Sequence, residues 1–171
     1  GIRDDLVTGV QTCALPICKE AMAQILRDSL LTLAQGTVYG PYRDAGSFKL
    51  SKVVATMQMP DSVEARHILI PVGLSRADSI TRSPLEARAF ADSLYAELKK
   101  NRRKFADFVS AHSSDIGSVE NGGHYDYFGY NTMVAPFRDF CFEGSTGDLG
   151  VVESQFGVHI IEIEGQKDKS T

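Results

Sequence analysis

The chain has 171 residues, of which 43% are hydrophobic and 23% charged, and its formal net charge is −4. These values are ordinary for one globular domain with part of another. The small negative charge gives no reason to expect nucleic acid or an anionic membrane as a partner. No apolar run approaches the ~18 residues that a membrane-spanning helix needs, so we expect no direct membrane contact in this fragment.

Residues 1–18 are set apart from the rest of the chain. Residues 7–17 resemble one reading frame of a common short-read sequencing adapter. We therefore expect natural sequence to begin near Cys18 or Lys19, and we exclude the preceding residues from reasoning about the fold. A real but irregular terminus is the alternative, and the DNA sequence across this junction distinguishes the two.

Residues 19–60 are interpreted as the C-terminal part of a preceding, degenerate domain plus a linker. Apolar residues at helical spacing predict a helix over 19–35. The segment 36–57 can be laid beside the end of the chain, with Phe48 where the second copy has His159. A phenyl ring offers no hydrogen bond, so this copy would lack the imidazole function. A chance hairpin with glycine turns is the alternative.

The block that begins at residue 61 opens with a strand and two helices. Alternation over 64–70 predicts a strand in which His67 belongs to a nonpolar row. Ser83 and Glu86 form a capping box around a proline, which predicts the start of a helix. A second helix is expected from about Arg103.

The rest of this block alternates turns, strands and one short helix. Glycines at 122 and 123 predict a turn with positive φ. Strands are expected over 125–128, 151–153 and 158–164, and a short helix over 136–142. This order predicts a small α+β domain whose mainly antiparallel sheet is covered by helices.

Six short motifs can be read in order between residues 61 and 165. They are residues 65–70, 105–110 with 113–115, 122–123, 133–137, 144–150 and 156–161. Their order and spacing resemble the parvulin family of peptidyl-prolyl isomerases. The resemblance implies that 61–165 form a rotamase domain with a four-stranded, mainly antiparallel sheet. Residues 166–171 are polar and are interpreted as a truncated linker.

The resemblance also implies a catalytic centre and a proline pocket. His67, Asp115 and His159 would be catalytic, with a hydrogen bond between the two imidazoles. The substrate-binding residues would be Tyr125, Met133, Phe137, Ser154 and Phe156. Each assignment has a plain structural alternative: the histidines and pocket residues would be core, and Asp115 would be a turn or cap residue.

Some features depart from the family pattern or fall outside it. Bacterial parvulins usually read Gly-Gly-Asp-Leu-Gly where this chain reads Gly-Gly-His-Tyr-Asp from residue 122, so we expect a reshaped pocket rim. The loop 72–82 lacks a tight basic cluster, so selectivity for phosphoserine-proline is not predicted. His112 is interpreted as a packing residue and His124 as an exposed loop residue. No metal site and no cofactor are predicted, because no spacing matches a known ligand pattern.

The implied activity is rotation of the peptide bond before proline in unfolded or extended polypeptides. That bond resists rotation with a barrier near ~20 kcal/mol, and an apolar pocket lowers it by disfavouring the charge-separated form of the amide. The chain would be one module of a folding factor on the periplasmic side of a bacterial envelope, held by an N-terminal anchor outside this fragment. A catalytically weak, peptide-binding chaperone module is the alternative function.

Overall fold

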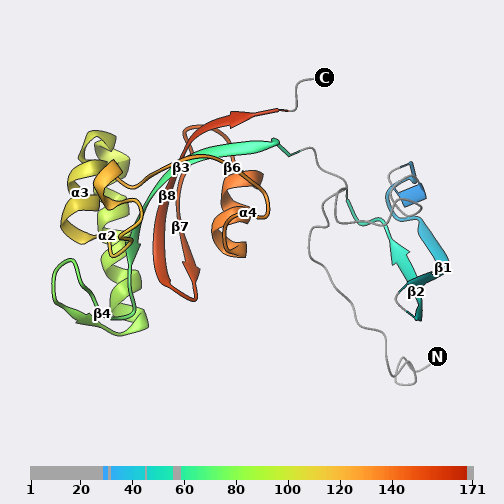
Figure 1. The fold of residues 1–171 in the computed structure, drawn as a ribbon, viewed down its shortest axis with the longest axis horizontal. Helices are drawn as coiled ribbons and strands as arrows, with labels where there is room; N and C mark the ends of the chain where they lie inside the picture. Colours follow the sequence, from blue (N-terminus) through green and yellow to red (C-terminus); the bar gives the residue numbers. More distant parts are fainter. Residues whose placement is uncertain (1–28, 31, 45, 56–58, 169–171) are drawn as a thin grey trace. The chain divides into compact units, whose positions relative to one another are not determined.

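The computed structural model describes residues 29–30, 32–44, 46–55 and 59–168 (Figure 1). Contacts divide the chain into two units, with the boundary between residues 57 and 58. Residues 1–18 and most of the helix predicted over 19–35 lie outside the described residues. Among the described residues, no helix combines the length and apolar character needed to cross a bilayer.

The described part of the first unit contains a β-hairpin. Strands β1 (Val38–Asp44) and β2 (Ser47–Lys52) pair in antiparallel fashion, with a register shift between Tyr39 and Tyr42. The side chain of Phe48 is 79% exposed, so it contributes no core packing within this hairpin. That the hairpin ends a degenerate upstream domain stays a prediction.

The second unit is built on a four-stranded sheet in the order β6-β3-β8-β7, with every neighbouring pair antiparallel. Its strands are β3 (Ser62–Ile70), β6 (His124–Gly129), β7 (Leu149–Ser154) and β8 (Gly157–Lys167). The predicted α+β class and the four-stranded antiparallel sheet are confirmed. The central pair, β3 and β8, comes from opposite ends of the domain.

Helices cover both faces of this sheet (Figure 1). Helices α2 (Pro84–Lys100) and α3 (Phe105–His112) pack against one face, and α4 (Ala135–Glu143) packs against the other. The buried sheet residues under α2 and α3 are Ile68, Ile70, Val158 and Ile160. Those on the α4 side include Val63, Ala65, Ile161 and Ile163. Each central strand therefore contributes alternate residues to two separate cores.

Local signals in the sequence account for the helix boundaries. Ser83 Oγ accepts a hydrogen bond from the Glu86 backbone N–H at 3.3 Å, and the Glu86 carboxylate accepts one from the Ser83 backbone N–H at 2.8 Å. The predicted capping box is thus confirmed, and such a cap stabilises a helix by about 1 kcal/mol. Single 3-10 turns precede α3 and β6, at η3 (Arg102–Lys104) and η4 (Val119–Asn121).

The loop after β3 contains a small hairpin that the sequence did not predict. Strands β4 (Gly73–Leu74) and β5 (Thr81–Arg82) are two residues long, too short to show any periodicity. The Arg82 guanidinium pairs with Asp78 and lies 4.3 Å from the centroid of the Phe90 ring on α2. This packing orders a segment that was interpreted as a plain loop.

Candidate active site

Two histidines meet between the central strands of the sheet. His67 on β3 and His159 on β8 place their Nδ1 atoms 3.2 Å apart, with ring planes inclined by 16°. Each residue is only 4% exposed. They are 92 positions apart in the sequence, and the antiparallel pairing of β3 with β8 brings them together. The expected contact between the imidazoles is present.

A carboxylate lies at the other side of the His67 ring. Asp115 Oδ2 is 2.7 Å from His67 Nε2, and it also accepts hydrogen bonds from the hydroxyls of Ser118 and Tyr125. The hydrogen bond with His67, followed by those with Ser118 and Tyr125, holds the pKa of Asp115 well below its usual range despite partial burial. Asp115 is therefore an ionised carboxylate at neutral pH.

The loop that carries Asp115 is fastened to β3. The Leu69 backbone N–H donates to Ser113 Oγ at 3.1 Å, and the Ser114 backbone N–H donates to the Leu69 carbonyl at 2.9 Å. These bonds attach the loop at a residue two positions from His67. The carboxylate is thereby set beside the imidazole by backbone contacts rather than by its side chain alone.

Gly123 allows a close backbone approach beside His67, on the same edge of β3 as the Asp115 loop. The His67 backbone N–H donates to the Gly123 carbonyl at 2.9 Å, and a Cβ on Gly123 would lie 2.3 Å from the His67 carbonyl oxygen. Gly123 also has φ of +84°, which L side chains rarely adopt. The predicted positive-φ turn is confirmed, and it fixes the backbone at the first histidine.

The hydrogen bonds determine a single pattern of ring protons for neutral imidazoles. A carboxylate only accepts, so His67 Nε2 carries the proton and His67 Nδ1 is an acceptor. His159 Nδ1 must then donate, which leaves His159 Nε2 as an acceptor for the Ser154 hydroxyl, 2.7 Å away. Ser154 Oγ in turn accepts from the Phe156 backbone N–H at 3.1 Å. Every polar atom of the pair has a partner.

The surroundings keep this pattern intact near neutral pH. Burial, reinforced by the neighbouring His67, lowers the pKa of His159 to about 4. Burial and the bond with Asp115 raise the pKa of Tyr125 to about 12, so its hydroxyl remains a donor. At neutral pH the site therefore combines a neutral His159 and a protonated Tyr125 hydroxyl with the negative carboxylate of Asp115.

A cavity of about 410 Å³ opens directly over the two rings. Its size lies in the range of small-ligand pockets, roughly 300–1,000 Å³. The residues that line it are His67, Leu69, Asp115, Tyr125, Thr132, Met133, Val134, Phe137, Phe156 and His159. Phe137 is buried and meets both imidazoles edge-on, whereas Phe156 is 55% exposed. The cavity is apolar around a polar floor.

Seven of the eight residues predicted for the site line this cavity. The eighth, Ser154, lies behind His159 and binds its far nitrogen. Ser118 was missed although it donates to Asp115 and lies 3.3 Å from His67 Nε2. Its spacing of three residues from an aspartate in a turn was the available signal. The pocket residues Leu69, Thr132 and Val134 were missed as well.

The other two histidines lie away from this cavity. His112 packs against Phe90 and Phe108, as expected. The interpretation of His124 as an exposed loop residue was wrong: it begins strand β6, and its side chain is 33% exposed. Strand β6 begins one residue earlier than expected, directly after Gly123, whose carbonyl already accepts a hydrogen bond from the His67 backbone N–H.

Two contacting imidazoles beneath an apolar cavity, on a four-stranded antiparallel sheet, define the parvulin class of domain. Comparison with known families gives the same result: the model of the PPIC-type PPIASE domain matches residues 48–167. The chain therefore belongs to this family, and the resemblance drawn from the six motifs is confirmed.

Individual relatives agree with this assignment. Chaperone SurA of Pseudomonas syringae pv. syringae is 31% identical over 147 residues, which are 82% of this chain and 33% of that protein. The chain thus spans about a third of the length of the curated relatives it matches.

Two solved structures share the fold. Peptidyl-prolyl isomerase ESS1 from Candida albicans is 25% identical with a TM-score of 0.54, over 61% of this chain and 63% of that chain. A Campylobacter jejuni structure is 28% identical with a TM-score of 0.50, over 64% and 40% of the two chains. It comes from a pair of structurally related SurA-like chaperones, the virulence factor PEB4 and the periplasmic protein Cj1289.

Proposed function

We propose that this chain catalyses cis-trans isomerisation of Xaa-Pro bonds in unfolded or extended polypeptides. The observation that carries the proposal is the pair of contacting imidazoles, hydrogen-bonded to Asp115, that forms the floor of an apolar cavity of about 410 Å³. Family membership and likeness to a peptidyl-prolyl isomerase support it. No cofactor and no covalent intermediate enter the reaction.

In this mechanism the proline ring enters the cavity against Met133, Phe137 and Phe156. The apolar walls exclude water, which disfavours the charge-separated resonance form that makes the C–N bond partly double. Because the C–N bond then has less double-bond character, it rotates more easily as the imide leaves planarity. His67, His159 and Asp115 act as catalytic residues by presenting a fixed polar surface to the imide. This surface interacts more favourably with the twisted imide than with the planar ground state, and that difference lowers the barrier.

The roles within the polar floor follow from the hydrogen bonds. Asp115 fixes the proton on His67 Nε2, and Ser154 fixes the acceptor nitrogen of His159. Ser154 is thus a positioning residue, because it acts on the substrate through His159. Tyr125 contributes its ring to the wall while its hydroxyl binds Asp115.

The wider setting is also a proposal. We infer that residues 61–165 form the catalytic module, that 19–60 end a preceding domain, and that the whole belongs to a folding factor on the periplasmic side of a bacterial envelope. The support is the similarity to chaperone SurA and to the Campylobacter jejuni structure of SurA-like chaperones, one of which is a periplasmic protein.

The test is an NMR exchange measurement on a short Xaa-Pro peptide with the 171-residue chain. Isomerase activity predicts faster cis-trans exchange, seen as line broadening or exchange cross-peaks that depend on enzyme concentration. Peptide shift changes that saturate without faster exchange would overturn the proposal and favour the chaperone alternative. A substitution of Phe137 by Ala, checked for folding by its own spectrum, should remove the acceleration because it opens the cavity wall.

A further inference from the structure

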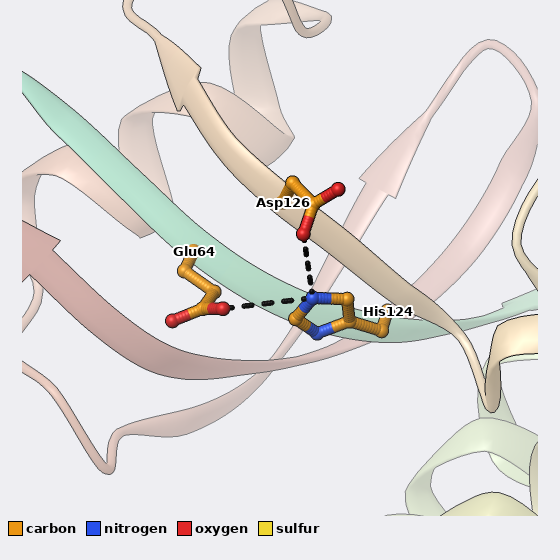
Figure 2. A group of neighbouring side chains, drawn as sticks. All are labelled: Glu64, His124 and Asp126. Atoms are coloured by element: carbon orange, nitrogen blue, oxygen red, sulfur yellow. Dashed lines mark hydrogen bonds and ion pairs between the residues drawn. The ribbon is translucent and has the colours of Figure 1, made fainter.

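A second cluster of histidine and carboxylates lies on the opposite face of strand β6 from the cavity. His124 and Asp126 flank Tyr125, and side chains alternate along a strand, so their side chains leave the sheet on the face away from the proline pocket. Glu64 on β3 reaches the same place, as Figure 2 shows. One ligand atom from each of these three residues lies within 4.8 Å of the other two.

A carboxylate outside these three residues orients the imidazole of His124. His124 Nδ1 lies 2.6 Å from Glu164 Oε2 on β8, so this nitrogen donates and the ring is held in place. Its Nε2 lies 3.3 Å from Asp126 Oδ1 and 3.5 Å from Glu64 Oε1. A carboxylate that binds one ring nitrogen while the other faces further oxygens is the usual arrangement around a metal-binding histidine.

The distances suit a small cation with a tetrahedral shell. With bonds of about 2.0–2.1 Å, neighbouring ligands of tetrahedral Zn²⁺ lie roughly 3.3–3.4 Å apart. The two distances from His124 Nε2, 3.3 and 3.5 Å, match this spacing. An imidazole with two carboxylates suits Zn²⁺ or a similar transition metal better than Mg²⁺ or Ca²⁺, which prefer oxygen ligands alone.

The backbone is irregular at this point on both sides of Glu64. Two residues of β6, Asp126 and Tyr127, stand opposite Glu64 alone, and Glu164 is the extra residue on β8. Such bulges re-aim side chains and are common beside functional sites. Gly165 leaves room for the Glu64 carboxylate, because a Cβ there would lie 2.9 Å from Glu64 Oε2.

The cluster is also open to solution. Asp126 is fully exposed, and about a quarter to a third of the Glu64 and His124 side chains is accessible. An ion can therefore enter without opening the fold, and water can take the remaining coordination position.

We propose that Glu64, His124 and Asp126 form a binding site for a divalent transition-metal ion, with Zn²⁺ as the expected ligand and Glu164 as the outer partner of His124. The site is separate from the isomerase centre and does not depend on the proposed function. Its three ligands come from β3 and β6, so a bound ion would link these strands directly behind Tyr125.

Isothermal titration calorimetry of the chelator-treated 171-residue chain with ZnCl₂ at pH 7.5 tests the site. We expect one Zn²⁺ per chain at this cluster, and no heat with MgCl₂ or CaCl₂. His124→Asn, Asp126→Asn and Glu164→Gln should each weaken Zn²⁺ binding by at least about tenfold, the usual cost of losing even an outer partner. Asp107→Asn, which removes another exposed carboxylate, on α3, is the matched control and should bind like the parent.

Two further readouts locate the ion and guard against misfolded variants. In NMR spectra of the parent, Zn²⁺ should shift the signals of His124 and its β6 neighbours at lower concentration than those of His67 or His159. The midpoint of thermal unfolding should rise with Zn²⁺ in the parent and in Asp107→Asn, but not in Asp126→Asn. Equal Zn²⁺ affinity of Asp126→Asn and the parent, or first shifts at the catalytic histidines, would overturn the proposal.

Discussion

Two histidine-carboxylate clusters lie on opposite faces of one sheet, and they differ mainly in burial. His67, His159 and Asp115 combine two imidazoles with one carboxylate under an apolar cavity. The cluster around His124 combines one imidazole with three carboxylates at the surface. Histidine and carboxylate side chains on the neighbouring strands β3 and β6 therefore lie in different electrostatic surroundings, one cluster buried and the other exposed to solvent.

The pKa values reflect this contrast. Burial lowers the pKa of His159 to about 4, whereas the hydrogen bond with Glu164 and the neighbouring Asp126 raise the pKa of His124. His159 is thus neutral at pH 7, which suits the hydrogen bonds at its two ring nitrogens. The exposed cluster carries excess negative charge, which suits a cation. Under the two proposals, burial therefore distinguishes the cluster that would act on a neutral substrate from the cluster that would bind an ion.

Removal of the buried pair should have the largest effect on activity. We expect His67→Ala combined with His159→Ala to reduce kcat/KM for an Xaa-Pro peptide by about 100-fold or more, because the fixed polar floor is lost. Exchange NMR on the same peptide measures this, with a spectrum of the variant to show that the sheet is intact. If the double variant turns over at a rate close to the parent, the two imidazoles are core residues only.

Acid should destabilise the domain through His159. The pKa of His159 is about 4 when folded and near 6.5 in an unfolded chain, so below pH 6.5 the unfolded state binds more protons. Stability should fall as the pH drops from 6.5 to 4, by on the order of 2–3 kcal/mol. Asp115, whose folded pKa is lowered, adds a further loss below its ordinary pKa near 4. Urea unfolding at pH 7 and pH 4.5 measures the difference.

The matched variant for this experiment is His159→Gln in a chelating buffer. Glutamine does not titrate in this range, so the part of the pH dependence that belongs to His159 should disappear. An unchanged slope between pH 6.5 and 4.5 would place the titration elsewhere and contradict the buried, neutral state of this ring.

The buried cluster of His67, His159 and Asp115 was largely predictable because it follows short motifs and strand alternation. His67 and His159 stand in apolar strands, and the period of two places each with its own row of core residues. The capping box of Ser83 and Glu86, a local hydrogen-bond pattern, predicted the start of α2. These features depend on neighbours within a few residues, which a sequence displays directly.

The exposed cluster could not be read from spacing. Glu64 is 60 residues from His124, and it reaches that side chain only because of bulges that shift the register on both sides of β3. Bulges leave no periodic signal. Ser118 was missed for a different reason: its spacing from Asp115 was visible in the sequence, but the direction of its hydroxyl depends on the turn that ends at Gly123.

A pair of glycines offers a direct comparison of the two faces. A Cβ on Gly123 would meet the His67 backbone at 2.3 Å, whereas one on Gly165 would meet the ends of the Tyr127 and Glu64 side chains at 2.5 and 2.9 Å. Backbone cannot yield, and Gly123 also has positive φ, so we expect Gly123→Ala to cost about 2–3 kcal/mol of unfolding free energy. Gly165→Ala should cost roughly 1 kcal/mol, since side-chain ends can rotate away.

Denaturant unfolding of the two glycine variants provides the measurement. Gly123→Ala should also lower isomerase activity, because it displaces the strand segment that carries His67. Equal costs for the two substitutions would show that the backbone near His67 adjusts as freely as surface side chains, and that Gly123 does not fix the position of the catalytic histidine.

The smallest expected effect is that of substituting Ser154, which in the proposed mechanism acts on the substrate through its hydrogen bond with His159. Ser154→Ala removes the hydroxyl that donates to His159 Nε2, so either ring nitrogen can then carry the proton. We expect kcat to fall about tenfold, equivalent to ~1.4 kcal/mol, with KM nearly unchanged. Ser154→Thr keeps the hydroxyl and should restore most of the activity. A rise in KM alone, or no rescue by threonine, would mean that Ser154 shapes the cavity rim through Phe156 instead of orienting the imidazole.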